Sequence, residues 1–117
     1  MKETVILARS EVVAVAERHG RAVKLLDGGK IAEARREFVV LAAELGGADR
    51  DTARVKIGAA DYQAKSTAAA LRYLRALQVS SPDADAERLY YLVLCEERNN
   101  NAEQVVAELD QLGRLYP

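Results

Sequence analysis

The sequence predicts an all-α protein, and three observations carry this prediction. Apolar residues recur at helical spacing along most of the 117-residue chain, and no segment alternates apolar and polar residues as a strand would. The prolines are Pro82 and Pro117, which leaves two stretches of more than thirty residues without a helix breaker. Small and apolar side chains also return in a fixed order at intervals of 36 and 35 residues. By its length the chain, residues 1–117, is a single domain.

Six helices are expected, separated by glycine, serine, proline or asparagine residues that favour turns. The first covers residues 3–27 and is either continuous or kinked at Gly20, because glycine costs a helix about 1 kcal/mol relative to alanine. Gly28 and Gly29 end it. The second helix is expected at residues 31–45, and the third runs from a cap at Asp49 or Asp51 to residue 63. The fourth is expected from residue 66 or 67 to 79, the fifth at 84–98 and the sixth at 102–115.

The recurring side chains define three units, each with four positions separated by steps of twelve, four and three residues. The positions are Ala22, Ala34, Phe38 and Leu41, then Gly58, Ala70, Leu74 and Leu77, then Val93, Val105, Leu109 and Leu112. Helices whose axes lie about 8–10 Å apart need small side chains where they cross. The spacing therefore predicts three helical hairpins stacked in the same phase. The alternative is an ordinary six-helix bundle in which the alanines merely suit packing.

On these residues the chain resembles the tetratricopeptide repeat family, whose period is about 34 residues. The resemblance covers residues 15–117, with units at roughly 15–48, 51–84 and 86–117. The positions that match the family pattern are Gly58, Ala34, Ala70, Phe38, Pro82 and Pro117. The chain departs from the pattern at Gly46, where a proline is usual, and at Val93 and Val105, where small residues are usual. The resemblance implies a right-handed α-α superhelix of about three hairpins with an N-terminal helical extension.

Composition and charge exclude several classes of function. The 17 basic and 18 acidic residues are interspersed, whereas a nucleic-acid surface needs a clustered basic excess. No apolar run approaches the roughly 20 residues that span a bilayer, so we expect no membrane insertion. The N-terminal apolar segment is interrupted by Arg9 and Glu11 and has no signal-peptide cleavage site. We therefore expect a cytoplasmic protein, or a periplasmic one if a leader was removed.

The sequence offers no assembled catalytic or metal-binding group. Cys95 is the single cysteine, which excludes an intramolecular disulfide and a cysteine-based metal cluster. It is expected to be a buried structural thiol, and His19, the single histidine, to be packed or partly exposed. The carboxylates are diffuse, as at Glu96–Glu97, and would attract a cation only weakly. We expect no catalytic residue, no metal, no cofactor and no enzymatic activity.

A protein-interaction scaffold is the function that the resemblance implies. In the family, the first helices of successive units line a concave groove that holds a peptide or protein partner. The groove-lining positions that match in this chain are His19, Val23, Lys56, Tyr62, Gln63, Tyr90, Tyr91, Leu94 and Arg98. Tyrosine suits this use, since it offers a large contact area and a polar group at little entropic cost. Glu87 would repel a carboxylate, so we expect no clamp for a C-terminal carboxylate.

Self-association is the alternative function, because the last predicted helix is apolar on more than one side. Its candidate residues are Val106, Leu109, Leu112 and Tyr116. Terminal repeats need a polar outer face for solubility, so an apolar one favours a dimer or a larger oligomer. A further alternative is an accessory domain of a larger regulatory protein.

Overall fold

The computed structural model describes the backbone of residues 2–117 and the side chains of residues 12–117. The short apolar segment before Arg9 and Glu11 lies outside the described side chains. Residues 2–117 form six helices and no strand, which confirms the all-α prediction for this part of the chain. The helices are α1 (Lys2–Asp27), α2 (Ile31–Glu44), α3 (Gly47–Gln63), α4 (Thr67–Ala76), α5 (Pro82–Arg98) and α6 (Ala102–Leu115).

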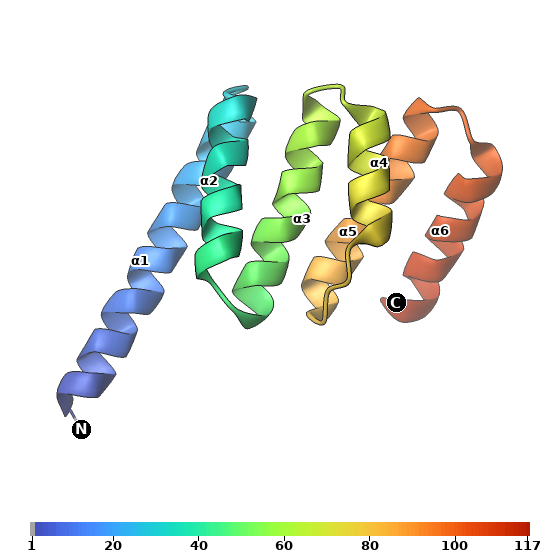
Figure 1. Cartoon of the computed structure of the whole chain (residues 1–117). Helices are drawn as coiled ribbons and strands as arrows, with labels where there is room; N and C mark the ends of the chain where they lie inside the picture. The colour runs from blue at the N-terminus through green and yellow to red at the C-terminus, as the bar shows by residue number, and fades with distance from the viewer. Residues whose placement is uncertain (1) are drawn as a thin grey trace.

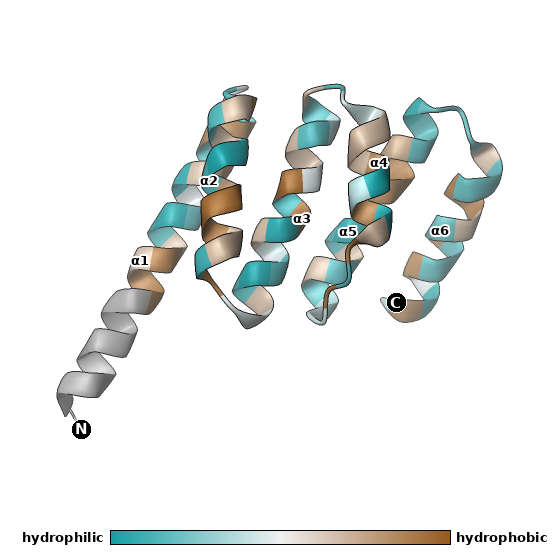
Figure 2. Ribbon diagram, in the orientation of Figure 1, coloured by the Kyte–Doolittle hydropathy of each residue, from teal (hydrophilic) through white to brown (hydrophobic). Residues whose placement is uncertain are grey.

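The helices stand side by side in a row (Figure 1), and the molecule measures 54 × 32 × 20 Å. Each helix packs against the next one in sequence, and α3 also packs against α5. The 26-residue α1 extends beyond the 14-residue α2 that packs on it (Figure 1). Apolar and polar segments alternate along the helices (Figure 2), as expected of helices that bury only one face.

The three hairpin turns have the same backbone geometry. Gly29, Lys65 and Asn100 each have a positive φ angle, and they are spaced 36 and 35 residues apart. In each turn the following amide donates a hydrogen bond of 2.9 Å to the carbonyl five residues earlier, from Lys30 to Leu25, Ser66 to Asp61 and Asn101 to Glu96. This is the bonding pattern of a Schellman turn, which satisfies the last carbonyl groups of a helix. The turn therefore repeats at the same interval as the packed side chains.

The backbone of Lys65 is strained at this turn, because its φ of 65° is unfavourable for a residue other than glycine. We expect Lys65→Gly to raise the free energy of unfolding by about 1 kcal/mol, as measured by urea denaturation. Asn100→Gly is the matched control at the equivalent turn. Asparagine tolerates this geometry, so its replacement should stabilise the protein less. An unchanged or lower stability of Lys65→Gly would contradict the expectation.

The positions with small or apolar residues form the core in the first two units and only part of it in the third. Ala22, Ala34, Phe38 and Leu41 are fully buried, as are Ala70 and Leu74. In the third unit Val93 is buried, whereas Leu109 is 49% exposed. The difference arises because α6 packs mainly against α5, whereas α2 and α4 each have a neighbouring helix on both sides.

Gly58 marks the closest approach between helices in this core. A Cβ atom added at Gly58 would lie 2.5 Å from Cδ2 and 2.7 Å from Cγ of Leu74, on the neighbouring α4. Real Cβ atoms do not approach carbon atoms this closely, so α3 and α4 cross at a point where only glycine fits. The expectation of a small residue at this crossing agrees with this geometry.

Several helix ends differ from the sequence prediction. α5 begins at Pro82, two residues earlier than expected, whereas α1 runs through Gly20 without a break, in line with the continuous alternative. Proline suits the first position of a helix because its φ is already helical and its missing amide is not needed there. α4 ends at Ala76, three residues before the predicted end. The expected cap of α3 is also wrong, because α3 begins at Gly47 and both candidate aspartates lie inside it.

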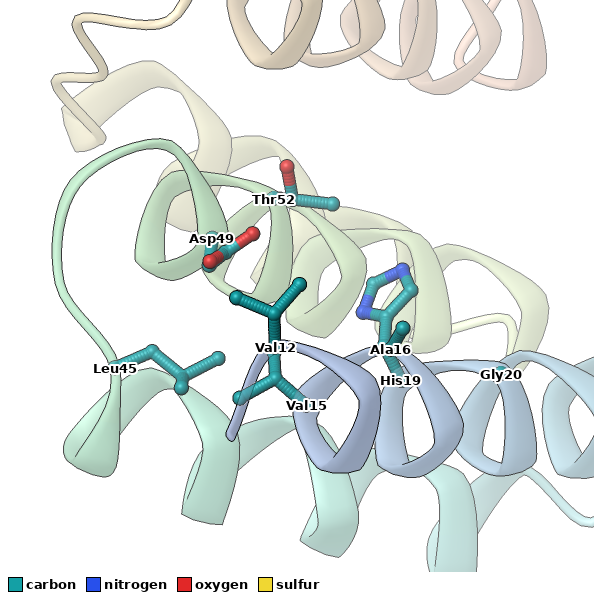
Figure 3. Close-up of a pocket in the computed structure, with 8 residues that line it drawn as sticks. All are labelled: Val12, Val15, Ala16, His19, Gly20, Leu45, Asp49 and Thr52. Atoms are coloured by element: carbon teal, nitrogen blue, oxygen red, sulfur yellow. The ribbon is translucent and has the colours of Figure 1, made fainter. Parts of the chain in front are cut away.

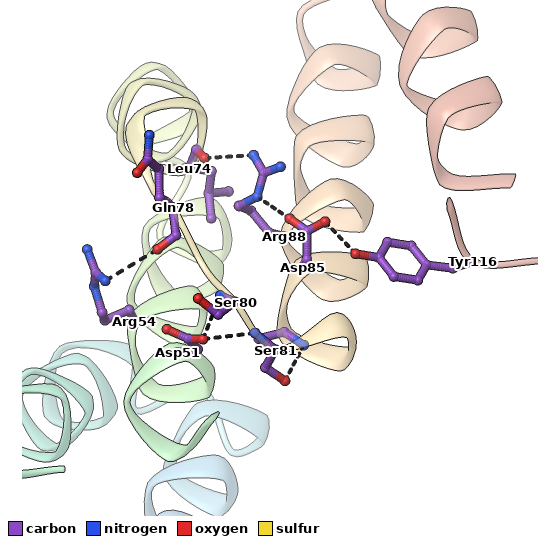
Figure 4. A network of polar contacts seen from close by, with 10 residues as sticks. Asp51, Arg54, Leu74, Gln78, Ser80, Ser81, Asp85, Arg88 and Tyr116 are labelled. Atoms are coloured by element: carbon purple, nitrogen blue, oxygen red, sulfur yellow. Dashed lines mark hydrogen bonds and ion pairs between the residues drawn. The ribbon is translucent and has the colours of Figure 1, made fainter. Parts of the chain in front are cut away.

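Asp51 serves instead to hold the segment between α4 and α5 (Figure 4). Its buried carboxylate accepts hydrogen bonds from the backbone amides of Ser80 and Ser81, at 2.9 and 3.0 Å. In the same region the guanidinium of Arg88 donates to the carbonyl of Leu74 and pairs with Asp85. These contacts connect α3, the α4–α5 segment and α5 over about thirty positions of sequence.

Candidate binding surface

One surface of the molecule combines side chains from α1, α3 and α5, and we call it the α1–α3–α5 face. An ion pair joins α3 to α5, with 2.6 Å between Nζ of Lys56 and Oε1 of Glu87. Both charges act on the pKa of His19 from α1 and on that of Tyr91 from α5. His19 of α1, Lys56 of α3, and Glu87 and Tyr91 of α5 therefore lie near one another.

A pocket of about 620 Å³ opens between α1 and α3 on this face (Figure 3). Its size falls in the range of sites that hold a small ligand or a partner's side chain. The lining residues are Val12, Val15, Ala16, His19, Gly20, Leu45, Asp49 and Thr52. Its walls are mainly aliphatic, while the imidazole of His19 and the carboxylate of Asp49 provide polar groups on opposite helices (Figure 3).

Gly20 lies in the wall of this pocket. It lies in the middle of α1, where glycine costs about 1 kcal/mol relative to alanine. A Cβ atom added there would meet no atom within 4 Å, so packing inside the chain does not require a glycine. The absent side chain instead leaves space in the pocket wall.

Burial favours the neutral form of His19. Its ring packs edge-on against Phe38, with 5.6 Å between the ring centroids. Burial lowers the pKa of His19 below its usual value of 6.5, and the nearby Lys56 lowers it further against the opposing effects of Glu87 and Asp49. A neutral imidazole is compatible with an apolar ligand and can also donate or accept one hydrogen bond.

Three tyrosines and an arginine form a second feature, on α3 and α5. Tyr91 packs edge-on against Tyr62 and Tyr90, at centroid separations of 6.1 and 5.4 Å. Tyr62 and Tyr91 are partly buried, whereas Tyr90 is 52% exposed. The guanidinium of Arg98 lies 3.7 Å from the centre of the Tyr62 ring. Of the three rings, that of Tyr90 is the most accessible to a partner.

Arg98 has a structural role, although it was predicted as a groove residue. Nη1 of Arg98 donates to the carbonyl of Tyr62 at 2.6 Å and to Oγ1 of Thr67 at 3.1 Å. It therefore joins the end of α5 to the α3–α4 turn. Val23 packs against the core of the first unit, and Gln63 and Leu94 are partly buried. Val23, Gln63 and Leu94 are thus buried to a similar degree as His19, Tyr62 and Tyr91, and Arg98 is exposed but engaged by its hydrogen bonds.

The predicted self-association residues divide into two pairs. Val106 and Leu109 are 67% and 49% exposed. Leu112 and Tyr116 instead pack against the chain's own core, and the hydroxyl of Tyr116 donates to Asp85. The sequence pattern did not separate the pairs because Val106, Leu109 and Leu112 are all apolar residues of α6, and Tyr116 follows directly after this helix.

Three further titratable side chains, those of Cys95, Glu96 and Glu108, are buried in the fold. Cys95 is fully buried, and burial raises the pKa of its thiol. Glu96 is buried and pairs with Arg75. The pKa of the buried Glu108 is raised, mainly by burial and secondly by the negative charge of Glu96. No group of three or more potential ligand side chains is positioned to hold a metal ion among the described side chains.

Most of the pocket was not predicted from the sequence. Only part of its lining is explained by the predicted site residues, which include His19 but not Val12, Val15, Leu45 or Asp49. One available signal was Gly20, a glycine inside a helix with no turn to explain it.

Comparisons with protein-family models, curated proteins and solved structures found no match. No helix in the part of the chain that the structure describes has both the length and the apolar character needed to cross a membrane.

Proposed function

We propose that this chain is a protein-interaction module of the tetratricopeptide type, built as a right-handed superhelix, which binds a segment of another protein on its α1–α3–α5 face. The proposed activity is binding, without catalysis. Its main support is the pocket between α1 and α3, which lies on the face formed by the first helices of the hairpins. The repeated turns at Gly29, Lys65 and Asn100 support the repeat architecture.

The pocket suggests what the bound segment carries. A large aliphatic side chain such as leucine would contact Val12, Val15 and Leu45 and remove apolar surface from water. The carboxylate of Asp49 at the pocket favours a basic residue next to that side chain. Further along the segment, the ring of Tyr90 would provide contact area. The segment is thus an aliphatic and basic peptide.

Selection of peptides tests this function. Random peptides displayed on phage are selected on the full chain, and the affinities of the enriched sequences are measured by calorimetry. We expect enrichment of aliphatic residues next to Lys or Arg. Val15→Glu places a charge in the pocket and should weaken binding at least about tenfold, a loss of about 1.4 kcal/mol.

Val40→Glu is the matched control, because Val40 is 42% exposed on α2 and lies outside the α1–α3–α5 face. This variant should bind the selected peptides as the unaltered chain does. Circular dichroism checks that both variants are folded. The proposal fails if no common sequence is enriched, or if Val15→Glu and Val40→Glu bind equally well.

A further inference from the structure

α6 carries an exposed stripe that the binding of a peptide does not use. Ala102, Val106, Leu109 and Gly113 are all exposed, with Val106 at 67% and Leu109 at 49%. At 100° per residue these four positions lie along one side of the helix. α6 stands at the end of the row and packs against α5 (Figure 1).

Gly113 points to a close approach at this stripe. It lies within α6, where glycine is the least favourable residue apart from proline. A Cβ atom added at Gly113 would meet nothing within 4 Å, so contacts within the chain do not explain the glycine. A glycine on an exposed helical face allows the backbone of another helix to approach closely.

The spacing of the stripe identifies the other helix. The steps from Ala102 through Val106 and Leu109 to Gly113 are four, three and four residues, so the stripe has the same spacing in both directions. When two copies of α6 lie antiparallel, Ala102 faces Gly113 and Val106 faces Leu109 of the other copy. We propose that two copies of this chain associate through α6 in this antiparallel arrangement, around a two-fold axis.

The charges beside the stripe favour the antiparallel direction. Glu103, Asp110 and Arg114 lie along one edge of the stripe and are exposed. Antiparallel pairing brings Glu103 of one copy within reach of Arg114 of the other, twice by symmetry. Parallel pairing would instead place like charges at the same level. Arg114 is 78% exposed and pairs with Asp110 at 2.5 Å, so it can contact both carboxylates.

Charge reversal tests this arrangement. Sedimentation equilibrium of the full chain over a wide concentration range should show monomers and dimers. Glu103→Arg and Arg114→Glu should each weaken the dimer at least about tenfold, because each places like charges together across the interface. The double variant E103R/R114E should recover the lost affinity, since it restores opposite charges in exchanged positions.

Val106→Asp and Leu115→Asp form the matched pair. Val106 lies in the stripe, whereas Leu115 is 53% exposed but lies nine residues away, on the opposite side of α6. We expect Val106→Asp to abolish the dimer and Leu115→Asp to leave it intact. The proposal is overturned by a chain that stays monomeric, by masses beyond a dimer, by equal effects of the two Asp variants, or by a double variant no tighter than the single ones.

Discussion

Replacing Leu74 with alanine will lower the free energy of unfolding by about 3 kcal/mol, the usual cost of removing a fully buried leucine side chain. A second substitution, Gly58→Ala, will then recover part of this loss. The reason is that the methyl group added at Gly58 would occupy space that the Leu74 side chain fills. Once that side chain is removed, only the greater helix propensity of alanine is left, about 1 kcal/mol in favour of the variant.

In the unaltered chain the same Gly58→Ala substitution will destabilise the protein. The added Cβ would lie 2.5 Å from Cδ2 of Leu74, and Leu74 is fully buried and has little room to move. Overpacking of this kind costs about 1–3 kcal/mol. Urea denaturation of the two single variants and the double variant completes the cycle. If Gly58→Ala changes the free energy of unfolding by the same amount with and without the Leu74 side chain, the inference that α3 and α4 cross closely at Gly58 is contradicted.

Asp51→Ala will lower the free energy of unfolding by about 3 kcal/mol. Asp51 is 8% exposed and its carboxylate accepts two backbone hydrogen bonds, so its removal leaves the amides of Ser80 and Ser81 without these partners. The loss will loosen the segment that leads from α4 into α5. Amide hydrogen exchange should show less protection at Ser80 and Ser81.

Asp51→Asn provides the control for this prediction. Both amides donate to the same oxygen, Oδ2, and the asparagine carbonyl can occupy its place. This variant should therefore lose less stability than Asp51→Ala, since it keeps the acceptor and loses only the charge. Equal losses in the two variants would mean that Asp51 acts through its charge and not through these hydrogen bonds.

The helices and turns were predicted from local signals in the sequence, namely turn-favouring residues and the helical spacing of apolar residues. Gly28 and Gly29 end α1, and the Asn99–Asn101 turn separates α5 from α6, as expected. The recurring small residues also predicted the buried positions of the first two units, including Gly58. Local signals were less accurate at the start of α3, because an aspartate that suits a helix cap suits equally well a contact with a distant backbone segment.

The candidate binding surface was only partly predictable. His19 and Tyr90 were selected from the resemblance, and they lie on or near accessible parts of the α1–α3–α5 face. Arg98 and Tyr116 looked equally available in the sequence, yet both are held by other parts of the chain. Whether a polar side chain is free or engaged depends on partners about 30 residues or more away in sequence.

The sequence by itself determined where the chain is helical, where each hairpin turns and which small residues lie between helices, because these depend on neighbours within a few residues and on a repeated spacing. Only the tertiary structure decided that α1 and α3 leave a pocket, that Asp51 holds the start of α5, and that one side of α6 is exposed. The physical reason is that these features arise from distances between helices, and the same apolar pattern is compatible with a helix that is covered and with one that is not.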